Sequence, residues 1–129
     1  MSTKEFLEGN PRKAAMEMLK LKHECAEIHK LKTMLEKAHT PFEWHERHEG
    51  EGEYRVLYMY QIIYPRDGEN SEYRVCSVVE GFGSYGYDDD RLEIMGLCGG
   101  EKKDVLGWLT AEDVFGRIKA HWETNRQEV

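Results

Sequence analysis

The chain has 129 residues, of which 40% are hydrophobic and 33% are charged, the composition of one soluble globular domain with its own core. The formal net charge of −7 is uneven: residues 1–40 contain eight Lys/Arg and six Asp/Glu, whereas residues 41–129 contain ten and nineteen. Because proteins bind duplex nucleic acid mainly by neutralising phosphates with Lys and Arg, the acidic region argues against duplex binding. It favours a protein partner, a basic surface or a small molecule.

The cysteines and the hydropathy pattern exclude further classes. Cys25, Cys76 and Cys98 are odd in number, widely spaced and without a Cys-x-x-Cys pair, which argues against a disulfide framework and a Cys-based zinc site. We therefore expect no metal and no cofactor. No apolar run reaches the length of a signal peptide or a membrane span, so we expect a cytoplasmic protein without a membrane partner.

Residues 10–39 are predicted to form one long helix, preceded by a flexible or short helical start over residues 1–9. Asn10 is a favourable N-cap and Pro11 suits the first helical position. Apolar residues then recur at spacings of three and four, giving one stripe: Ala14, Met18, Leu21, Cys25, Ile28, Leu31, Leu35 and Ala38. Such a helix is about 40 Å long. Either it lies across a sheet, or one end projects and supports a homodimer or a contact with another protein.

Residues 41–109 are predicted to form an antiparallel sheet of three to five strands. Phe42–Arg47, Tyr54–Tyr64 and Tyr73–Val79 have the alternation and β-branched or aromatic content of strands, and a turn containing Asp67 and Gly68 joins the last two. Two shorter segments complete the set. Leu92–Leu97 is interpreted as a strand, with a helical turn as the alternative, and Val105–Leu109 as a short edge strand.

Residues 110–124 are predicted to form a C-terminal helix, with residues 125–129 as a frayed tail. Thr110 and Asp113 have the spacing of a capping box. One apolar stripe follows, formed by Ala111, Val114, Phe115, Ile118 and Trp122. Because consecutive strands are flanked by helices, the predicted fold class is α+β, one domain with the C-terminal helix packed on an antiparallel sheet.

Two neighbouring segments contain the candidate binding residues. Gly81–Gly86 has three glycines, and its Phe82, Ser84 and Tyr85, together with Tyr64 of the adjacent strand, would suit a planar ligand or a peptide. The alternative is a loop whose aromatic residues close the edge of the core.

An acidic run follows this loop. Asp88, Asp89 and Asp90 would supply oxygen ligands or an acidic docking face, and the alternative is a solvated charge run. His45 and His48 are three apart and would point to opposite faces of a strand. No spacing indicates a Ser/His/acid or Cys/His arrangement, so no catalytic residue is predicted.

Several segments resemble small phage and prophage proteins of Firmicutes, a group without an assigned function. They are Thr40–Trp44, Tyr60–Pro65, Val75–Val79, Gly83–Gly86, Leu92–Leu97 and Gly107–Val114, and the likeness spans about residues 30–122. The resemblance implies a phage accessory protein in the cytoplasm of a host cell, and it implies no active-site residues.

Three functional hypotheses follow, in order of preference. The first is a non-enzymatic acidic protein that binds a host or defence protein. The second is a protein that binds or sequesters a small molecule or nucleotide with the Gly83–Gly86 loop. The third is a metal-dependent enzyme that uses the Asp88 run or the histidines.

Overall fold

The computed structural model describes residues 10–99 and 104–126, which form an α+β fold with one five-stranded antiparallel sheet. The strands lie in chain order: β1 (Glu43–Glu49), β2 (Val56–Pro65), β3 (Arg74–Gly81), β4 (Leu92–Met95) and β5 (Val105–Leu109). The helices are α2 (Pro11–Leu19), α3 (Ala26–Lys37) and α4 (Ala111–Arg126), with short 3-10 turns η1 (Gly52–Tyr54), η2 (Glu69–Ser71) and η3 (Tyr87–Asp89). The predicted α+β class, the antiparallel sheet and the C-terminal helix are confirmed.

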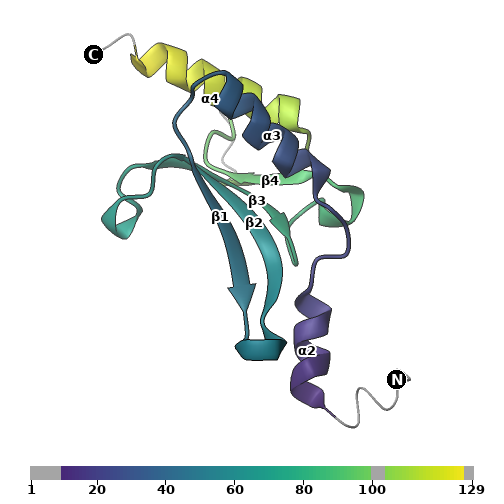
Figure 1. Ribbon diagram of the computed structural model, residues 1–129. Coiled ribbons are helices and arrows are strands. Elements are labelled where there is room, and N and C mark those ends of the chain that lie inside the picture. The colour runs from purple at the N-terminus through teal and green to yellow at the C-terminus, as the bar shows by residue number, and fades with distance from the viewer. Residues whose placement is uncertain (1–9, 100–103, 127–129) are drawn as a thin grey trace.

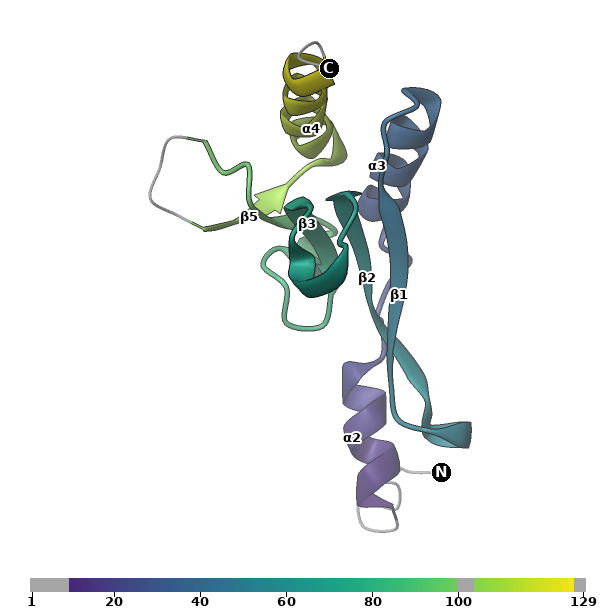
Figure 2. The ribbon, with the colours of Figure 1, turned by 90° about the vertical axis from the view of Figure 1, so that its left-hand side faces the viewer.

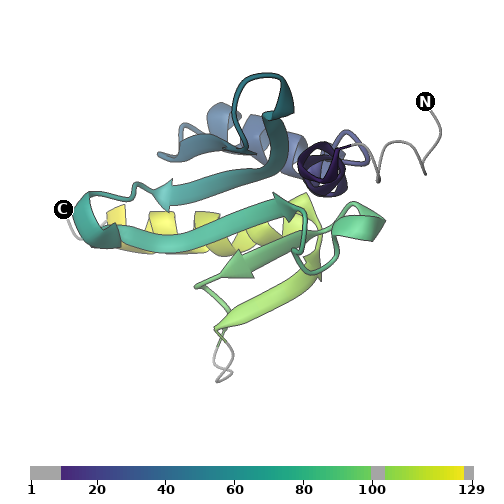
Figure 3. The ribbon, with the colours of Figure 1, turned by 90° about the horizontal axis from the view of Figure 1, so that it is seen from below.

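The core lies between the sheet and the two helices that cross one of its faces, α3 and α4 (Figure 1). In Figure 3 the sheet is seen from below, and β3 passes in front of α4. The helices and the sheet contribute side chains without solvent exposure, among them Leu31, Leu35, Ile62, Val78, Ile94, Val114 and Ile118. Burial of this apolar surface is the main stabilising contribution to such a fold.

The prediction of one long N-terminal helix is wrong. The helix ends at Leu19 and a second one begins at Ala26. Two intervening N–H groups bond to distant parts of the chain, Leu21 N to Leu57 O (3.3 Å) and Lys22 N to the hydroxyl of Tyr87. Cys25 then has the left-handed backbone conformation, with φ of 54°. The helix breaks because these tertiary acceptors replace the helical ones.

The break separates the two helices in space. Figures 1 and 2 show α2 beside the lower ends of β1 and β2, whereas α3 lies over the sheet beside α4. Asn10 caps α2 as predicted, accepting from Lys13 N at 3.0 Å. The projecting long helix that suggested a homodimer is therefore absent from the described residues, and the homodimer itself stays a prediction.

The later elements agree with the sequence. Residues 92–95 form a strand and Val105–Leu109 forms the edge strand β5. The capping box at the start of α4 is confirmed: Asp113 N donates to Thr110 Oγ1 at 3.2 Å, and Thr110 N donates to Asp113 Oδ2 at 3.3 Å. This helix continues through Arg126, two residues beyond its predicted end. The predictions for residues 1–9 and 127–129 lie outside the described residues.

The face of the sheet opposite the helices is partly closed by polar side chains. Both Nε and Nη2 of Arg47 donate to Gln61 Oε1, at 2.9 and 2.6 Å, and Gln61 Nε2 donates to Ser77 Oγ at 2.7 Å. Ile63 is buried on the same face of β2. Neighbouring side chains therefore bury the second face of β2 at Ile63 and leave it half-buried toward the start of the strand.

The hydroxyl of Tyr87 provides a test of the helix break. Tyr87→Phe removes the acceptor of Lys22 N, and we expect a loss of about 1 kcal/mol in the free energy of unfolding, measured by urea denaturation. Tyr58→Phe is the matched control, because the hydroxyl of Tyr58 has no hydrogen-bond partner within the described residues. Equal effects of the two substitutions would contradict the assigned role of Tyr87.

Candidate functional site

The β3–β4 connection, residues 82–91, is the segment around which the candidate site is built. Its backbone is anchored to β2 where Phe82 N donates to Tyr58 O at 2.9 Å, and it is closed on itself where Arg91 N donates to Gly86 O at 3.0 Å. Ser84 Oγ donates to Gly81 O at 2.8 Å. The connection therefore has a defined shape, with one face toward solvent and the other toward the start of α3.

The outer face of the connection forms an open hollow of about 270 Å³, lined by Gly83–Asp89 and Trp108. The rings of Tyr85 and Trp108 lie nearly parallel, with centroids 6.0 Å apart and an interplanar angle of 10°. Both are exposed, at 55% and 59%. Asp89 joins them, because Trp108 Nε1 donates to its Oδ2 at 3.2 Å. We call this surface the aromatic–acidic hollow.

Two backbone features hold Trp108 at the surface. Its φ of 56° is in the left-handed region, which costs a non-glycine residue on the order of 1–3 kcal/mol. Gly86 allows the close approach, since a Cβ there would lie 2.9 Å from both N and Cα of Trp108. Trp108 N donates in turn to Tyr85 O at 3.3 Å. The exposure of this indole is thus a product of the surrounding fold.

The inner face of the connection meets the N-terminus of α3 through two carboxyl groups. Glu80, completely buried on β3, accepts from Ile28 N at 3.3 Å through Oε1. Asp90 accepts from Glu27 N at 3.2 Å through Oδ1. Carboxylates are stabilised there by the free N–H groups and the helix dipole. Glu27 extends the chain of contacts to α4, because its Oε2 accepts from Ala111 N at 2.6 Å.

The Asp90 carboxyl group lies beside that of Glu80, and two neighbouring carboxyl groups are compatible only when one of them holds a proton. Burial, followed by the hydrogen bond to Asp90 and its charge, raises the pKa of Glu80 to about 9. Burial also acts to raise the pKa of Asp90, but the hydrogen bonds from Glu80 and from the Glu27 backbone lower it overall. At neutral pH Glu80 therefore holds the proton and Asp90 is ionised.

His23 and Cys25, from the break before α3, lie against this pair. His23 Nδ1 accepts from Cys25 N at 3.0 Å, and Nε2 donates to Tyr87 O at 2.7 Å. These partners assign the neutral imidazole with its proton on Nε2. Burial and the nearby carboxyl groups of Glu80 and Asp90 raise the pKa of the Cys25 thiol to about 12. Ligand atoms of His23, Cys25 and Glu80 lie within 4.8 Å of one another.

The structure brings together four of the seven residues that the sequence indicated. Ser84, Tyr85, Asp88 and Asp89 line the hollow. Phe82 is exposed on the same loop but does not line it.

The other two lie elsewhere. Tyr64 is buried under α4, where its hydroxyl is 2.8 Å from His121 Nδ1, and Asp90 points inward to α3. The Asp88 run therefore does not converge on one point, and it does not form the shared oxygen-ligand set that a metal-dependent enzyme would need there.

The sequence alone does not identify Trp108 as a site residue, nor the buried group formed by His23, Cys25 and Glu80. Trp108 is 23 residues from Tyr85 and was assigned only to the edge strand. Cys25 was assigned to the apolar stripe of a long helix, which would have separated it from His23 and from Glu80. A glycine directly before an aromatic residue in a strand, Gly107, was the one local signal: a Cβ there would lie 2.3 Å from Tyr85 Cβ.

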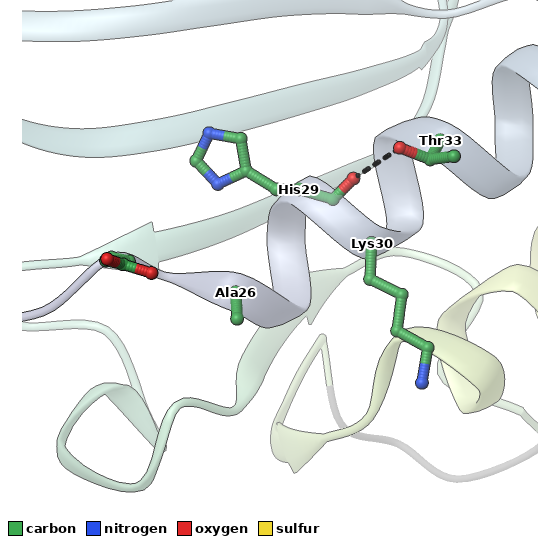
Figure 4. Close-up of a pocket in the computed structure, with 5 residues that line it drawn as sticks. Ala26, His29, Lys30 and Thr33 are labelled. Carbon is green, nitrogen blue, oxygen red and sulfur yellow. Dashed lines mark hydrogen bonds between the residues drawn. The ribbon is translucent and has the colours of Figure 1, made fainter.

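A second hollow lies on the exposed side of α3, but its polar side chains do not converge on a common point. Figure 4 shows that the His29 ring and the Lys30 side chain point in different directions. Thr33 Oγ1 donates to His29 O at 3.2 Å, His29 Nδ1 donates to Cys25 O at 2.9 Å, and Lys30 pairs with Glu112 of α4. These polar groups already have partners within the fold.

Comparison with protein-family models, with curated proteins and with solved structures found no match. Among the described residues, no helix has the length and apolar composition required to cross a membrane. The functional conclusion therefore depends on the geometry of the β3–β4 connection.

The proton on Glu80 predicts a pH-dependent stability. Because the folded pKa is about 9 and the usual value is 4.5, the folded state holds an extra proton between these values. The contribution of this proton to the free energy of unfolding is fully present below the unfolded pKa of 4.5. It is lost as pH rises toward the folded pKa of about 9, by at most about 1.4 kcal/mol per pH unit. Glu80→Gln keeps a hydrogen-bond donor near Asp90 but has no titrating group. The free energy of unfolding of this variant should therefore fall less steeply than that of wild type from pH 5 to 9, when both are freed of metal ions with a chelator.

Urea denaturation at several pH values measures this difference. Glu36→Gln on the exposed side of α3 is the control and should follow the wild-type curve. Other ionisable side chains also face Glu80, namely His23, Cys25, Glu27, Tyr87 and Asp90. They are unchanged in the variant, so its difference from wild type reports on Glu80 alone. A wild-type pH slope in Glu80→Gln would refute the assigned proton.

Proposed function

We propose that this protein is a non-enzymatic binding protein that docks a positively charged segment of a protein partner in the aromatic–acidic hollow. The observation that supports this most directly is the exposed pair of parallel rings, Tyr85 and Trp108, beside Asp88 and Asp89. The fold holds Trp108 outward at a cost in backbone conformation, which is typical of functional positions.

The chemistry of the hollow suits a cationic side chain. A Lys or Arg group over an aromatic face contributes about 0.5–1 kcal/mol at an exposed site, and Trp is the strongest such partner. Neighbouring carboxylates add charge-assisted hydrogen bonds, for which the planar guanidinium of Arg is best shaped. The net charge of −7 would attract a basic partner over longer distances and raise its association rate.

The polar groups of the hollow favour binding over catalysis. The Ser84 hydroxyl donates to Gly81 O and accepts from Gly81 N at 3.0 Å, so it supports the loop. Asp89 is held by the Trp108 indole. A nucleophile would need a base within hydrogen-bond reach, and Ser84 is hydrogen-bonded to backbone instead.

The biological setting of this proposal follows from the resemblance to phage and prophage proteins. We place the protein in the host cytoplasm as a phage accessory protein, and we propose a host or defence protein as its partner. A homodimer is compatible with this role and would be seen in the native mass of the 15.1 kDa chain.

A small planar molecule, such as a nucleotide, is the second candidate, because two parallel rings and a hydroxyl also suit a flat ligand. The hollow is smaller than the usual range of roughly 300–1,000 Å³ for such pockets. Thermal denaturation with a panel of nucleotides decides this: a concentration-dependent rise in Tm with one of them would favour the second candidate over the first.

Removal of the indole is expected to weaken docking. We expect Trp108→Ala to reduce the affinity for a short Arg-rich peptide by about 0.5–1 kcal/mol, roughly 2–5-fold in Kd. Chemical shifts of the ¹⁵N-labelled protein measure both affinity and location, and in wild type they should change at Tyr85, Asp88, Asp89 and the Trp108 indole. The same peptide with Glu in place of Arg should not bind.

Charge reversal tests the acidic half of the hollow. Asp88→Lys with Asp89→Lys should abolish docking of the Arg-rich peptide and capture of a partner from a Firmicutes lysate. The control is Glu69→Lys with Glu72→Lys, which changes the net charge equally at an exposed turn on the opposite side of the molecule in Figure 1. Equal losses in both double variants would mean unspecific attraction and would refute docking at the hollow.

A further inference from the structure

We propose that His23, Cys25 and Glu80 bind one divalent metal ion, of the class represented by Zn²⁺, on the inner face of the β3–β4 connection. This site lies on the other side of the loop from the hollow and does not depend on the proposed docking function. It contrasts with the sequence-based expectation of no metal, which considered only local Cys and His spacing.

The first support is the convergence of three different ligand types in the interior. The imidazole, the thiol and the carboxyl group come from residues 23, 25 and 80, and their ligand atoms lie within 4.8 Å of one another. Cys25 and Glu80 are completely buried. A fold brings such groups together from distant positions only if tertiary contacts hold them there, as the broken helix does for His23 and Cys25.

The second support is an unpartnered oxygen. Glu80 Oε2 is buried, has no hydrogen-bond donor among the described residues, and lies 3.9 Å from His23 Nε2. A metal ion at this position would give the unpartnered oxygen a partner and would offset the charge of the buried carboxylate.

The third support is the match of the donor set to the metal. Thiolate sulfur, imidazole nitrogen and carboxylate oxygen together are typical of zinc, whereas calcium and magnesium require oxygen ligands. With zinc–ligand bonds of about 2.0–2.3 Å, tetrahedral ligands stand about 3.3–3.7 Å apart. The three groups must therefore draw together by about 1 Å, and a water molecule would complete the tetrahedron.

Binding requires proton release and a local rearrangement. The Cys25 thiol and the Glu80 carboxyl each lose a proton to water, and both then bind as anions. His23 must bind through a nitrogen lone pair. Binding through Nε2 moves the ring proton to Nδ1 and breaks the hydrogen bonds with Tyr87 O and Cys25 N. The metal would then link the start of α3 directly to β3, replacing the proton on Glu80.

Zinc titration of the chelator-treated, full-length protein tests the site. Native mass spectrometry and elemental analysis should find one zinc ion per chain, and Tm should rise with zinc concentration. Cobalt in place of zinc should give a thiolate-to-metal charge-transfer absorption. Cys25→Ser should remove this absorption, and Cys25→Ser and Glu80→Gln should each weaken zinc binding at least about tenfold.

Cys98→Ser is the matched control, because Cys98 is a partly buried thiol outside the cluster that donates to backbone carbonyls, as a serine hydroxyl can. It should keep wild-type affinity and the cobalt absorption. Glu80→Gln retains the hydrogen bonds of the protonated acid, so it tests the site even if Cys25→Ser does not fold. Absence of zinc binding at micromolar free zinc, or equal binding by wild type and Glu80→Gln, would overturn the proposal.

Discussion

The contact between Glu80 and Asp90 at the N-terminus of α3 is the interaction on which the rest of the structure depends. The two acids accept from Ile28 N and Glu27 N, and Glu27 in turn accepts from the first residue of α4. Three acidic side chains thus link β3 and the β3–β4 connection to α3, and α3 to α4. Burying two acidic groups is costly unless charge and hydrogen bonds are satisfied, so this contact also fixes how the elements must be placed.

The same contact explains why the β3–β4 connection presents a defined outer surface. Its inner residues, Tyr87 and Asp90, are bound to the segment before α3 and to α3 itself. Its outer residues, Tyr85 and Asp89, are held by the strained and exposed Trp108. A rigid binding surface loses little conformational entropy on binding. The contacts of Glu80 and Asp90 therefore favour binding at the hollow by fixing the shape of the loop that forms it.

The sequence predicted the elements whose signals are local. Alternating residues indicated the strands, and the reciprocal bonds of Thr110 and Asp113 were visible as a spacing of three. It failed at residues 20–25, where apolar spacing and helix propensity continue without interruption. The acceptors that break the helix, Leu57 O and the Tyr87 hydroxyl, lie 36 and 65 residues further along the chain. Tertiary hydrogen bonds outweighed propensity there.

By itself, the sequence determined the α+β class, the antiparallel sheet, the C-terminal helix with its cap, and a Gly/aromatic loop followed by acids as the candidate binding segment. It could do so because side-chain periodicity and capping act between residues a few positions apart. Only the tertiary structure decided that Trp108 completes the hollow and that Tyr64 and Asp90 lie outside it. It also brought the side chains of His23, Cys25 and Glu80 close together. These juxtapositions arise from packing between distant segments, which no local spacing encodes.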